Sequence, residues 1–250
     1  MDTRAQFVNF LEKYQNVSLY HDLDISGLPV DEQGFQSPEN KRFFGDVFNT
    51  FRPRCLLELG SWKGTSAIMF ARLMLKYCEN PVIACVDTWI GSIEHWTSAE
   101  GRKRLALRHG YPSLYERFAT NIVRASVAAY VTPLPMLTKT AIELAKRSRV
   151  CVDAVYVDAS HEYAEVLEDV CGVWDLIGED GILIADDYNA PGVRRAIQEF
   201  CERPGVFGLY NAGVPWPEAL IVKKQVMRER AIAGHTSLID IPRGITASTA

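Results

Sequence analysis

From residue 52 onward, short apolar runs alternate with amphipathic stretches, and this alternation restricts the fold more than any other feature of the chain. Apolar runs of strand length lie at Cys55–Leu59, Val82–Val86, Ala128–Pro133, Ala154–Asp158 and Gly181–Ala185. Strands separated by helices in this way are typically parallel and joined by right-handed crossovers that cover both faces of a sheet. We therefore predict an α/β fold with a Rossmann-like, mostly parallel sheet.

The stretches between these runs have the periodicity of amphipathic helices. Helices are expected over Thr65–Tyr77, Leu114–Val123, Thr138–Ala145 and Glu162–Ile177. A further helix should begin at Pro191-Gly192, because proline suits the first turn of a helix.

Two final strand-like runs, Val206–Tyr210 and Ala219–Lys223, are connected by a segment that contains Asn211-Ala212-Gly213 and two prolines. Because this connection is too short for a crossover helix, the two strands should be antiparallel. The expected sheet therefore has seven strands and ends in a C-terminal antiparallel hairpin.

The 250 residues carry a formal net charge of −4, so the chain as a whole is not attracted to nucleic acid or to an anionic membrane surface. We expect neither as a partner, and no apolar run reaches the roughly 18 residues that span a bilayer. The six cysteines form no C-x-x-C pair, which favours free thiols and a cytoplasmic location. The basic stretch Arg102–Arg108 is either a solvated helix face or a surface that binds an anionic substrate.

The first strand–helix junction, from Glu58 to Ser66, reads ELGSWKGTS. Gly60 and Gly64 let the backbone turn tightly and approach a ligand, while Thr65 or Ser66 can cap the following helix. In an open parallel sheet, ligands bind beyond the carboxyl ends of the strands. The middle glycine of the dinucleotide fingerprint is missing here, which argues against a dinucleotide.

Two acids near this junction favour a cationic, ribose-bearing ligand. Glu58 would repel a pyrophosphate but suits a ligand that carries an ammonium and a sulfonium. The next strand ends in Asp87, where a carboxylate can accept hydrogen bonds from both ribose hydroxyls. The alternative is that Glu58 is a surface charge and Asp87 a helix cap. We predict S-adenosylmethionine (SAM) as the cofactor, bound by Glu58, Gly60, Ser61, Gly64, Thr65, Ser66, Asp87, Thr88 and Trp89.

A second group of acids follows the next two strands of the parallel sheet, with Asp158 after one and the pair Asp186-Asp187 after the other. Carboxylates at the ends of neighbouring parallel strands point into one crevice, where their repulsion favours a bound cation. Hard oxygen ligands suit Mg²⁺, so we predict a magnesium site of Asp158 with Asp186, Asp187 or both. Alternatively, Asp158 caps a helix and Asp187 binds a backbone amide.

His161 follows Asp158 by three residues, at the start of an expected helix. A helix N-terminus, a nearby Mg²⁺ and a sulfonium would each disfavour the imidazolium, so we expect a neutral ring that acts as the general base. Ser160 and a metal-bound water are the alternative proton acceptors.

These segments resemble the SAM-binding motifs of class I methyltransferases across residues 52–203. Val86-Asp87-Thr88-Trp89 with Gly91-Ser92 is similar to a segment of the sugar O-methyltransferases of macrolide and aminocoumarin biosynthesis, and of cephalosporin-hydroxylase-like proteins. The resemblance implies that Asp158 and one or both of Asp186 and Asp187 hold magnesium, which binds vicinal hydroxyls of the acceptor. It also supports His161, because the macrolide-sugar branch has a histidine at this spacing, whereas the aminocoumarin branch has an Asp where Ser160 stands.

We therefore predict a Mg²⁺-dependent O-methyltransferase that acts on a hydroxyl of a small molecule, either a sugar or a secondary metabolite. Residues 52–225 would form the SAM-binding catalytic domain, with an N-terminal helical cap over residues 1–51 and a polar C-terminal tail over residues 226–250. The cap is also a candidate contact of a homo-oligomer. The alternatives are a hydroxylase- or oxidoreductase-like relative and a non-catalytic SAM-binding protein.

Overall fold

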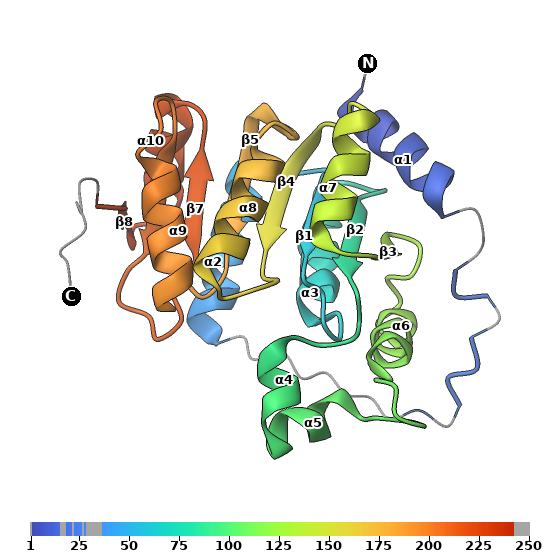
Figure 1. Ribbon diagram of the computed structural model, residues 1–250. Helices are drawn as coiled ribbons and strands as arrows, with labels where there is room; N and C mark the ends of the chain where they lie inside the picture. Colours follow the sequence, from blue (N-terminus) through green and yellow to red (C-terminus); the bar gives the residue numbers. More distant parts are fainter. Residues whose placement is uncertain (1, 16–18, 22, 27, 29–36, 243–250) are drawn as a thin grey trace.

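The computed structural model describes residues 2–15, 19–21, 23–26, 28 and 37–242, and a central sheet runs through it (Figure 1). Its strands are β1 (Cys55–Leu59), β2 (Val82–Asp87), β3 (Val131–Pro135), β4 (Val152–Val157), β5 (Ile177–Ala185), β6 (Phe207–Asn211), β7 (Ala219–Val222) and β8 (Leu238–Asp240). They lie in the order β3-β2-β1-β4-β5-β7-β6-β8. Strands β1 to β5 are parallel, whereas β7 is antiparallel to both β5 and β6.

This topology confirms the predicted Rossmann-like sheet and its antiparallel C-terminal hairpin. The predicted number of seven strands was wrong, because β8 adds an eighth strand that pairs antiparallel with β6. Both β8 and α10 (Gln225–Gly234) lie in the segment predicted to be a polar tail. Their few apolar side chains are widely spaced in the sequence but buried, and they include Met227, Ala231 and Leu238. The last eight residues, 243–250, lie outside the described part of the chain.

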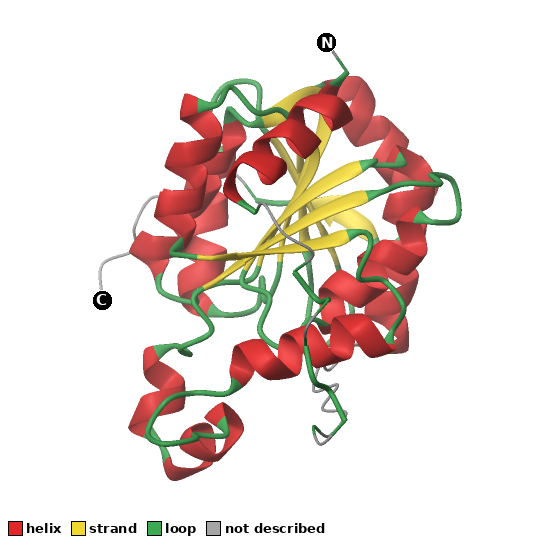
Figure 2. Ribbon diagram, turned by 90° about the vertical axis from the view of Figure 1, so that its right-hand side faces the viewer, coloured by secondary structure: helices red, strands yellow, loops and turns green. Residues whose placement is uncertain are grey.

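Helices cover both faces of the sheet (Figure 2). One hydrophobic core contains side chains of α1 (Thr3–Tyr14), α7 (Thr138–Arg147), α8 (Tyr163–Trp174) and α9 (Pro191–Cys201). The core on the other face contains side chains of α2 (Pro38–Phe51), α3 (Thr65–Met74), α6 (Leu114–Arg124) and α10. Burial on both faces explains why the parallel strands are continuous apolar runs in the sequence. None of the helices in the described residues is both long and apolar enough to cross a membrane.

The N-terminal helices take part in these cores. Phe7 of α1 is buried on one face of the sheet and Phe44 of α2 on the other. The Phe44 ring lies edge-on to Tyr156 of β4, with 5.8 Å between the ring centroids. Between α1 and α2, residues 16–18, 22, 27 and 29–36 lie outside the described residues.

Some predicted boundaries differ from the observed ones for local reasons. The strand expected from Ala128 begins only at Val131, because a turn closes with the Tyr130 N–H donating to the Val127 carbonyl at 2.9 Å. Helix α8 ends at Trp174, and Ile177 begins β5 instead.

Two short helices, α4 (Ile93–Thr97) and α5 (Ala99–Leu105), follow β2 and project beyond the carboxyl ends of the parallel strands (Figures 1 and 2). Ile93 is 68% exposed and Trp96 is 37% exposed. The projection therefore forms a wall beside the strand ends, where ligands of such sheets bind.

Candidate active site

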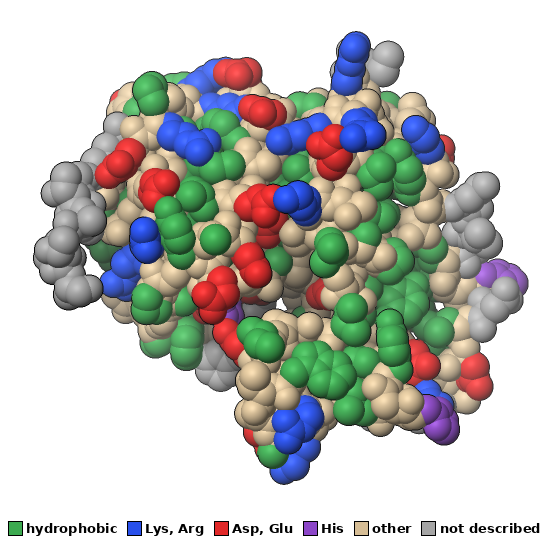
Figure 3. Space-filling model, in the orientation of Figure 1, with side chains coloured by type: hydrophobic (Ala, Val, Ile, Leu, Met, Phe, Trp, Pro, Cys, Tyr) green, Lys and Arg blue, Asp and Glu red, His purple; other side chains and the backbone are tan. Residues whose placement is uncertain are grey.

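A cavity of about 1050 Å³ lies at the carboxyl ends of the parallel strands. It extends from the β1–α3 loop and the end of β2 to the ends of β4 and β5, and it also reaches the β3–α7 connection and the start of β7. The surface is hollowed between the main body and the α4–α5 projection, where acidic side chains gather over α8 (Figure 3). This size lies at the upper end of small-molecule sites, so a nucleoside cofactor and an acceptor can share the cavity.

Gly60 lies where β1 and β4 approach each other just beyond their paired residues. Its φ is +85°, and a Cβ at this position would lie 2.0 Å from the carbonyl oxygen of Asp158. The Gly60 N–H donates to the Val86 carbonyl at 2.8 Å, and the Asp158 N–H donates to the Leu59 carbonyl at 2.8 Å. Because these neighbours are backbone atoms, only glycine fits here without moving a strand.

Asp87 joins the end of β2 to the glycine-rich loop. Its Oδ2 accepts the N–H groups of Ser61 at 3.1 Å and Trp62 at 2.8 Å, and its Oδ1 accepts the N–H of Trp89 at 2.7 Å. Burial raises the pKa of Asp87, and these backbone donors act in the opposite direction. A carboxylate has about four acceptor positions. Asp87 also lines the cavity, so its predicted contact with the ribose hydroxyls stays a prediction.

Trp62 and Trp89 adopt left-handed backbone conformations, with φ of +44° and +53°. Such values are uncommon for bulky residues and are often found at functional sites. The Trp89 Nε1 donates to the Trp62 carbonyl at 2.8 Å, which ties the two loops together. The Trp89 side chain is only 2% exposed and packs on Phe118. It therefore supports the site from the core and does not line the cavity, contrary to its predicted role.

Glu58 is fully buried beneath the loop. Its Oε2 accepts hydrogen bonds from Ser61 Oγ at 2.6 Å and Cys85 Sγ at 3.1 Å, and burial raises the pKa of the carboxyl. Glu58 is not among the residues that line the cavity, so its predicted contact with a cationic ligand stays a prediction. Its role in this structure is to hold Ser61.

Most of the predicted cofactor residues do line the cavity, namely Gly60, Ser61, Thr65, Ser66, Asp87 and Thr88. The Oγ1 of Thr65 is buried and has no hydrogen-bond partner among the described residues, so a ligand can satisfy it. Gly64 does not line the cavity. It is the N-cap of α3 with φ of +83°, and a Cβ there would meet the Phe118 ring at 3.0 Å.

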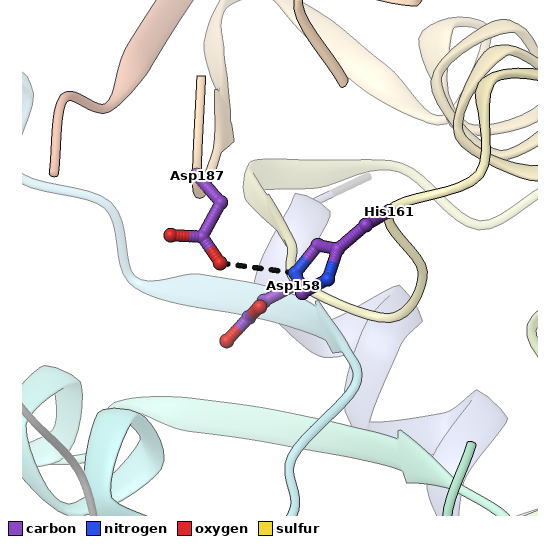
Figure 4. Close-up of side chains that lie close together, drawn as sticks. All are labelled: Asp158, His161 and Asp187. Atoms are coloured by element: carbon purple, nitrogen blue, oxygen red, sulfur yellow. Dashed lines mark ion pairs between the residues drawn. The ribbon is translucent and has the colours of Figure 1, made fainter. Parts of the chain in front are cut away.

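Three of the predicted reaction-site residues come together at the ends of β4 and β5. Asp158, His161 and Asp187 each offer one ligand atom, and these atoms lie within 4.8 Å of one another (Figure 4). Burial and the neighbouring carboxylates of Asp186 and Asp187 raise the pKa of Asp158 well above its usual range. A cation between the carboxylates would relieve this repulsion, so the residues fit a site for a hard divalent ion.

Asp186 is held by protein groups. Its Oδ2 accepts a hydrogen bond from the Tyr156 hydroxyl at 2.6 Å, and its Oδ1 accepts the Asp187 N–H at 2.8 Å. Burial and Asp187 raise its pKa, while the Tyr156 hydroxyl lowers it. The two acids therefore differ in their surroundings. Asp187 belongs to the metal-capable cluster of Asp158, His161 and Asp187, whereas Asp186 is held by protein groups beside it.

His161 lies just before α8 and faces two carboxylates. Its Nε2 is 3.0 Å from Oδ2 of Asp187, and its Nδ1 is 3.5 Å from Oε1 of Glu94. The hydrogen bond to Asp187 is the largest cause that raises the pKa of His161 to about 9, against the effect of burial. This direction is opposite to the predicted neutral ring, because the prediction considered cations and the helix N-terminus but not the carboxylate of Asp187.

The sequence did not indicate the wall formed by Glu218, Asn40 and Trp216, which all line the cavity. Glu218 is 1% exposed, and its Oε1 accepts a hydrogen bond from Asn40 Nδ2 at 2.9 Å. Its Oε2 meets no hydrogen-bond donor among the described residues, although the carboxyl group of Asp186 lies beside it. Asn40 Nδ2 also donates to the Trp216 carbonyl at 3.0 Å. The only sequence signal was an acid directly before the apolar run of β7.

Cationic side chains surround Trp62 on another wall. The Trp62 ring stacks on His95 with 4.3 Å between the ring centroids, and Lys63 Nζ and the Arg104 guanidinium lie 5.5 Å and 5.8 Å from the Trp62 centroid. All four residues line the cavity. Within the basic stretch 102–108, Arg104 is the residue that lines this cavity, whereas Arg108 lies beyond the end of α5 and forms an ion pair with Glu116 at 2.7 Å.

Comparison with known proteins identifies the family. A model for a methyltransferase domain matches residues 57–188, which is more than half of the chain. The chain belongs to this methyltransferase domain family. The matched range contains Gly60, Asp87, Asp158 and Asp187, so the predicted enzyme class is confirmed. A search of curated protein sequences gives no match to this methyltransferase.

Solved structures share the fold of this methyltransferase at low sequence identity. The O-methyltransferase from Bacillus cereus, in complex with S-adenosylhomocysteine (SAH), has a TM-score of 0.55 and 16% identity, covering 86% of this chain and 91% of that chain. TomG from Streptomyces achromogenes, involved in tomaymycin synthesis and in complex with SAM, has a TM-score of 0.54 and 16% identity over 88% of this chain and 89% of its own. CalS11, a TDP-rhamnose 3′-O-methyltransferase of calicheamicin biosynthesis, has a TM-score of 0.52 and 16% identity, covering 88% of this chain and 93% of that chain.

Proposed function

We propose that this methyltransferase transfers the methyl group of SAM to a hydroxyl group of a small molecule and requires Mg²⁺. The observation that carries the proposal is the shared cavity, which joins the glycine-rich loop and Asp87 to the cluster of Asp158, His161 and Asp187. The solved neighbours support it, because one is an O-methyltransferase bound to SAH, another is bound to SAM, and CalS11 is a TDP-rhamnose 3′-O-methyltransferase.

The residues proposed to hold SAM are those that line the cavity beside the β1–α3 loop. Gly60 lets a ligand approach the backbone, and Asp87 retains capacity for a ribose hydroxyl. The buried, unpartnered Oγ1 of Thr65 offers a polar contact in the same region. When bound, SAM supplies an electrophilic methyl group, and the protein's task is to align the acceptor oxygen with it.

The residues proposed to hold Mg²⁺ are Asp158 and Asp187. Their carboxylates belong to the cluster of ligand atoms, and their repulsion is what a divalent cation would offset. When bound, the ion would orient acceptor oxygens and stabilise the alkoxide that forms as the proton leaves.

His161 is the proposed general base, in the neutral form that Mg²⁺ would favour, because a cation held by Asp187 would offset the carboxylate that raises the pKa of His161. Its ring lies in the metal-capable cluster, where an acceptor hydroxyl must come close. Once His161 has taken the hydroxyl proton, the imidazolium lies 3.0 Å from the Asp187 carboxylate and 3.5 Å from that of Glu94. Both carboxylates stabilise the charge that the proton transfer creates.

The acceptor is proposed to lie against the wall of Asn40, Glu218 and Trp216. Burial and Asp186 raise the pKa of Glu218 well above its usual range, and its carboxyl group lines the cavity, where it can form a hydrogen bond with an acceptor hydroxyl. Trp216 is 48% exposed and offers a flat apolar surface at the cavity. A carboxyl group beside an exposed indole suits a hydroxylated ring, such as a sugar.

The two alternatives explain the site less well. A non-haem iron hydroxylase uses two histidines and one carboxylate, whereas this cluster contains two carboxylates and one histidine. A non-catalytic SAM-binding protein would not need partly buried, mutually repelling carboxylates at the cofactor cavity. None of the six cysteines, all of which lie in the described residues, forms a disulfide, and this supports the proposed cytoplasmic location.

The proposal is tested by incubating the purified protein with SAM labelled in its methyl group and a panel of sugars, glycosides and phenols. We expect label in an alkali-stable ether, loss of transfer after EDTA treatment, and recovery when Mg²⁺ is restored. Asp158→Asn should lose transfer, while Glu143→Gln, on the exposed face of α7 and outside the cavity lining, serves as the control. Unchanged transfer after chelation would remove the requirement for a metal, and label found only on nitrogen would contradict O-methylation.

A further inference from the structure

One wall of the cavity gathers hydrogen-bond donors around the Trp62 ring, and the mechanism above makes no use of it. This donor wall consists of Trp62, Lys63, His95 and Arg104. The Arg104 guanidinium and Lys63 Nζ lie within 6 Å of the Trp62 ring centroid, at 5.8 Å and 5.5 Å. The indole Nε1 of Trp62 is buried and meets no acceptor among the described residues. Because a buried N–H group without an acceptor is unfavourable, the donor wall suits a ligand that brings acceptor oxygens.

His95 adds a neutral donor to this wall. Its Nδ1 accepts the backbone N–H of Ser92 at 3.2 Å, so the neutral ring carries its proton on Nε2. Burial is the largest cause that lowers the pKa of His95, and the charges of Arg104 and Lys63 act in the same direction. The ring is therefore neutral at pH 7, with an Nε2–H donor on a residue that lines the cavity.

Arg104 differs from its neighbour in α5. Lys103 pairs with Glu100 at 3.3 Å and does not line the cavity. Arg104 has no carboxylate partner within the described part of the chain, and its guanidinium lies over the Trp62 ring instead. A guanidinium presents a fork of N–H donors that matches two oxygens of a carboxylate or a phosphate. Arg104 is thus the cation of the donor wall that can bind an oxyanion without giving up an ion pair.

The acids near the donor wall have other contacts. Glu94 and Asp87 are the two acids whose charges act on His95. The Oε1 of Glu94 faces Nδ1 of His161 at 3.5 Å, and Asp87 accepts three backbone N–H groups. Because Glu94 and His95 are consecutive residues of α4, the donor wall lies close to the proposed general base. One small molecule can therefore reach both.

We propose that the donor wall binds an anionic group of the acceptor, a carboxylate or a phosphate, and that Arg104 is the residue that recognises it. The proposal rests on the proposed O-methyltransferase function. It narrows the acceptor to hydroxylated small molecules that also carry an oxyanion, with the hydroxyl at the metal-capable cluster and the oxyanion beside Trp62.

The carboxylate of SAM itself is the competing occupant of the donor wall. Arg104 comes from α5, which projects beyond the strand ends, whereas the residues proposed to hold SAM follow β1 and β2 directly (Figure 1). This placement favours the acceptor. If Arg104 held the cofactor carboxylate, its loss would weaken SAH binding. If it holds the acceptor, its loss leaves SAH affinity unchanged and alters only the affinity for anionic acceptors.

The experiment is calorimetric titration of two matched pairs of probes into the protein loaded with SAH and Mg²⁺. One pair is rhamnose 1-phosphate and methyl rhamnoside, and the other is 3,4-dihydroxycinnamate and its methyl ester. The proteins are the wild type, Arg104→Gln and the control Lys103→Gln, which removes the same charge at the adjacent position outside the cavity lining.

We expect wild type and control to bind the anionic member of at least one pair roughly tenfold or more tightly than the neutral member. Arg104→Gln should lose most of this preference and keep its SAH affinity. A preference in the first pair alone identifies a phosphate, and one in the second pair alone identifies a carboxylate.

Equal or undetectable binding of all four probes by the SAH-loaded wild type would overturn the proposal, as would an unchanged preference in Arg104→Gln. Loss of SAH affinity in Arg104→Gln would also overturn it and assign Arg104 to the cofactor. Failure of the wild type to bind SAH would instead refute the proposed function, on which this inference depends.

Discussion

The Oδ2 atom of Asp87 accepts the backbone N–H of Trp62 at 2.8 Å, and this bond joins the end of β2 to the loop after β1. The same oxygen accepts the Ser61 N–H. One carboxylate therefore builds the loop and also faces the cavity. A residue with both roles should affect folding and cofactor binding together.

Replacing Asp87 by asparagine tests this double role. Asp87→Asn leaves one acceptor oxygen and turns an NH₂ group toward backbone donors, so we expect the free energy of unfolding to fall by about 1–3 kcal/mol. SAH affinity should fall roughly 100-fold, because the loop and the ribose contact are both disturbed. Thermal melting and calorimetry measure the two effects, with the exposed Asp180→Asn as the control. Wild-type SAH affinity in Asp87→Asn would show that the carboxylate does not take part in binding.

The close approach of Gly60 to Asp158 gives a sharper steric prediction. In Gly60→Ala the new methyl group would lie 2.0 Å from a backbone oxygen, so β1 and β4 must separate. We expect a loss of at least about 3 kcal/mol in urea unfolding and no detectable SAH binding. Gly45→Ala is the control, because its Cβ would meet nothing within 4 Å and helix α2 should gain about 0.5–1 kcal/mol. Equal stability of the two variants would contradict the steric account.

His161→Ala should separate chemistry from cofactor binding. The variant lacks the proposed base, so we expect the transfer rate to fall about 10²–10⁴-fold, with SAH affinity nearly unchanged. Glu94→Gln is a useful companion, because Glu94 reaches only the Nδ1 of His161, at 3.5 Å, and is 60% exposed. Its effect should be much smaller. Full activity in His161→Ala would assign the proton to Ser160 or to a metal-bound water.

The stability of the protein should depend on pH through Asp169. Burial is the largest cause that raises the pKa of this carboxyl from 3.8 to about 6, and Glu165 and Glu168 act in the same direction. Because the folded state holds the proton more tightly than the unfolded chain, the free energy of unfolding falls as pH rises through this window. Asp169→Asn removes the effect, so it should be more stable than wild type by at most about 3 kcal/mol above pH 6 and gain nothing near pH 4. Urea unfolding at both pH values measures this, and an equal difference at the two would contradict the assignment.

The strand ends were the most predictable part of the site. Asp158 and Asp187 follow buried parallel strands that are neighbours in the sheet, and such strands bring their carboxyl ends to one edge. His161 comes with Asp158 because only two residues separate them along the chain. Sequence reasoning could therefore place these residues in one crevice without knowing any distance.

Contacts between distant segments were not predictable in the same way. Asn40 lies in α2 and Glu218 precedes β7, and no local pattern indicates that their side chains form a hydrogen bond. The direction of a side chain was also missed where the backbone is unusual. Trp89 follows β2 as expected, but its positive φ turns the residue into the core. The short strand β8 was missed because only a few apolar residues specify it.

The central claim, a SAM-binding methyltransferase site beside a metal-capable cluster, is tested most directly by titrating the purified protein with SAM and, separately, with NAD, each with and without Mg²⁺. We expect one SAM site and no NAD binding, with the glycine-rich loop and Asp87 responsible for the selection. Tight NAD binding without SAM binding would contradict the account.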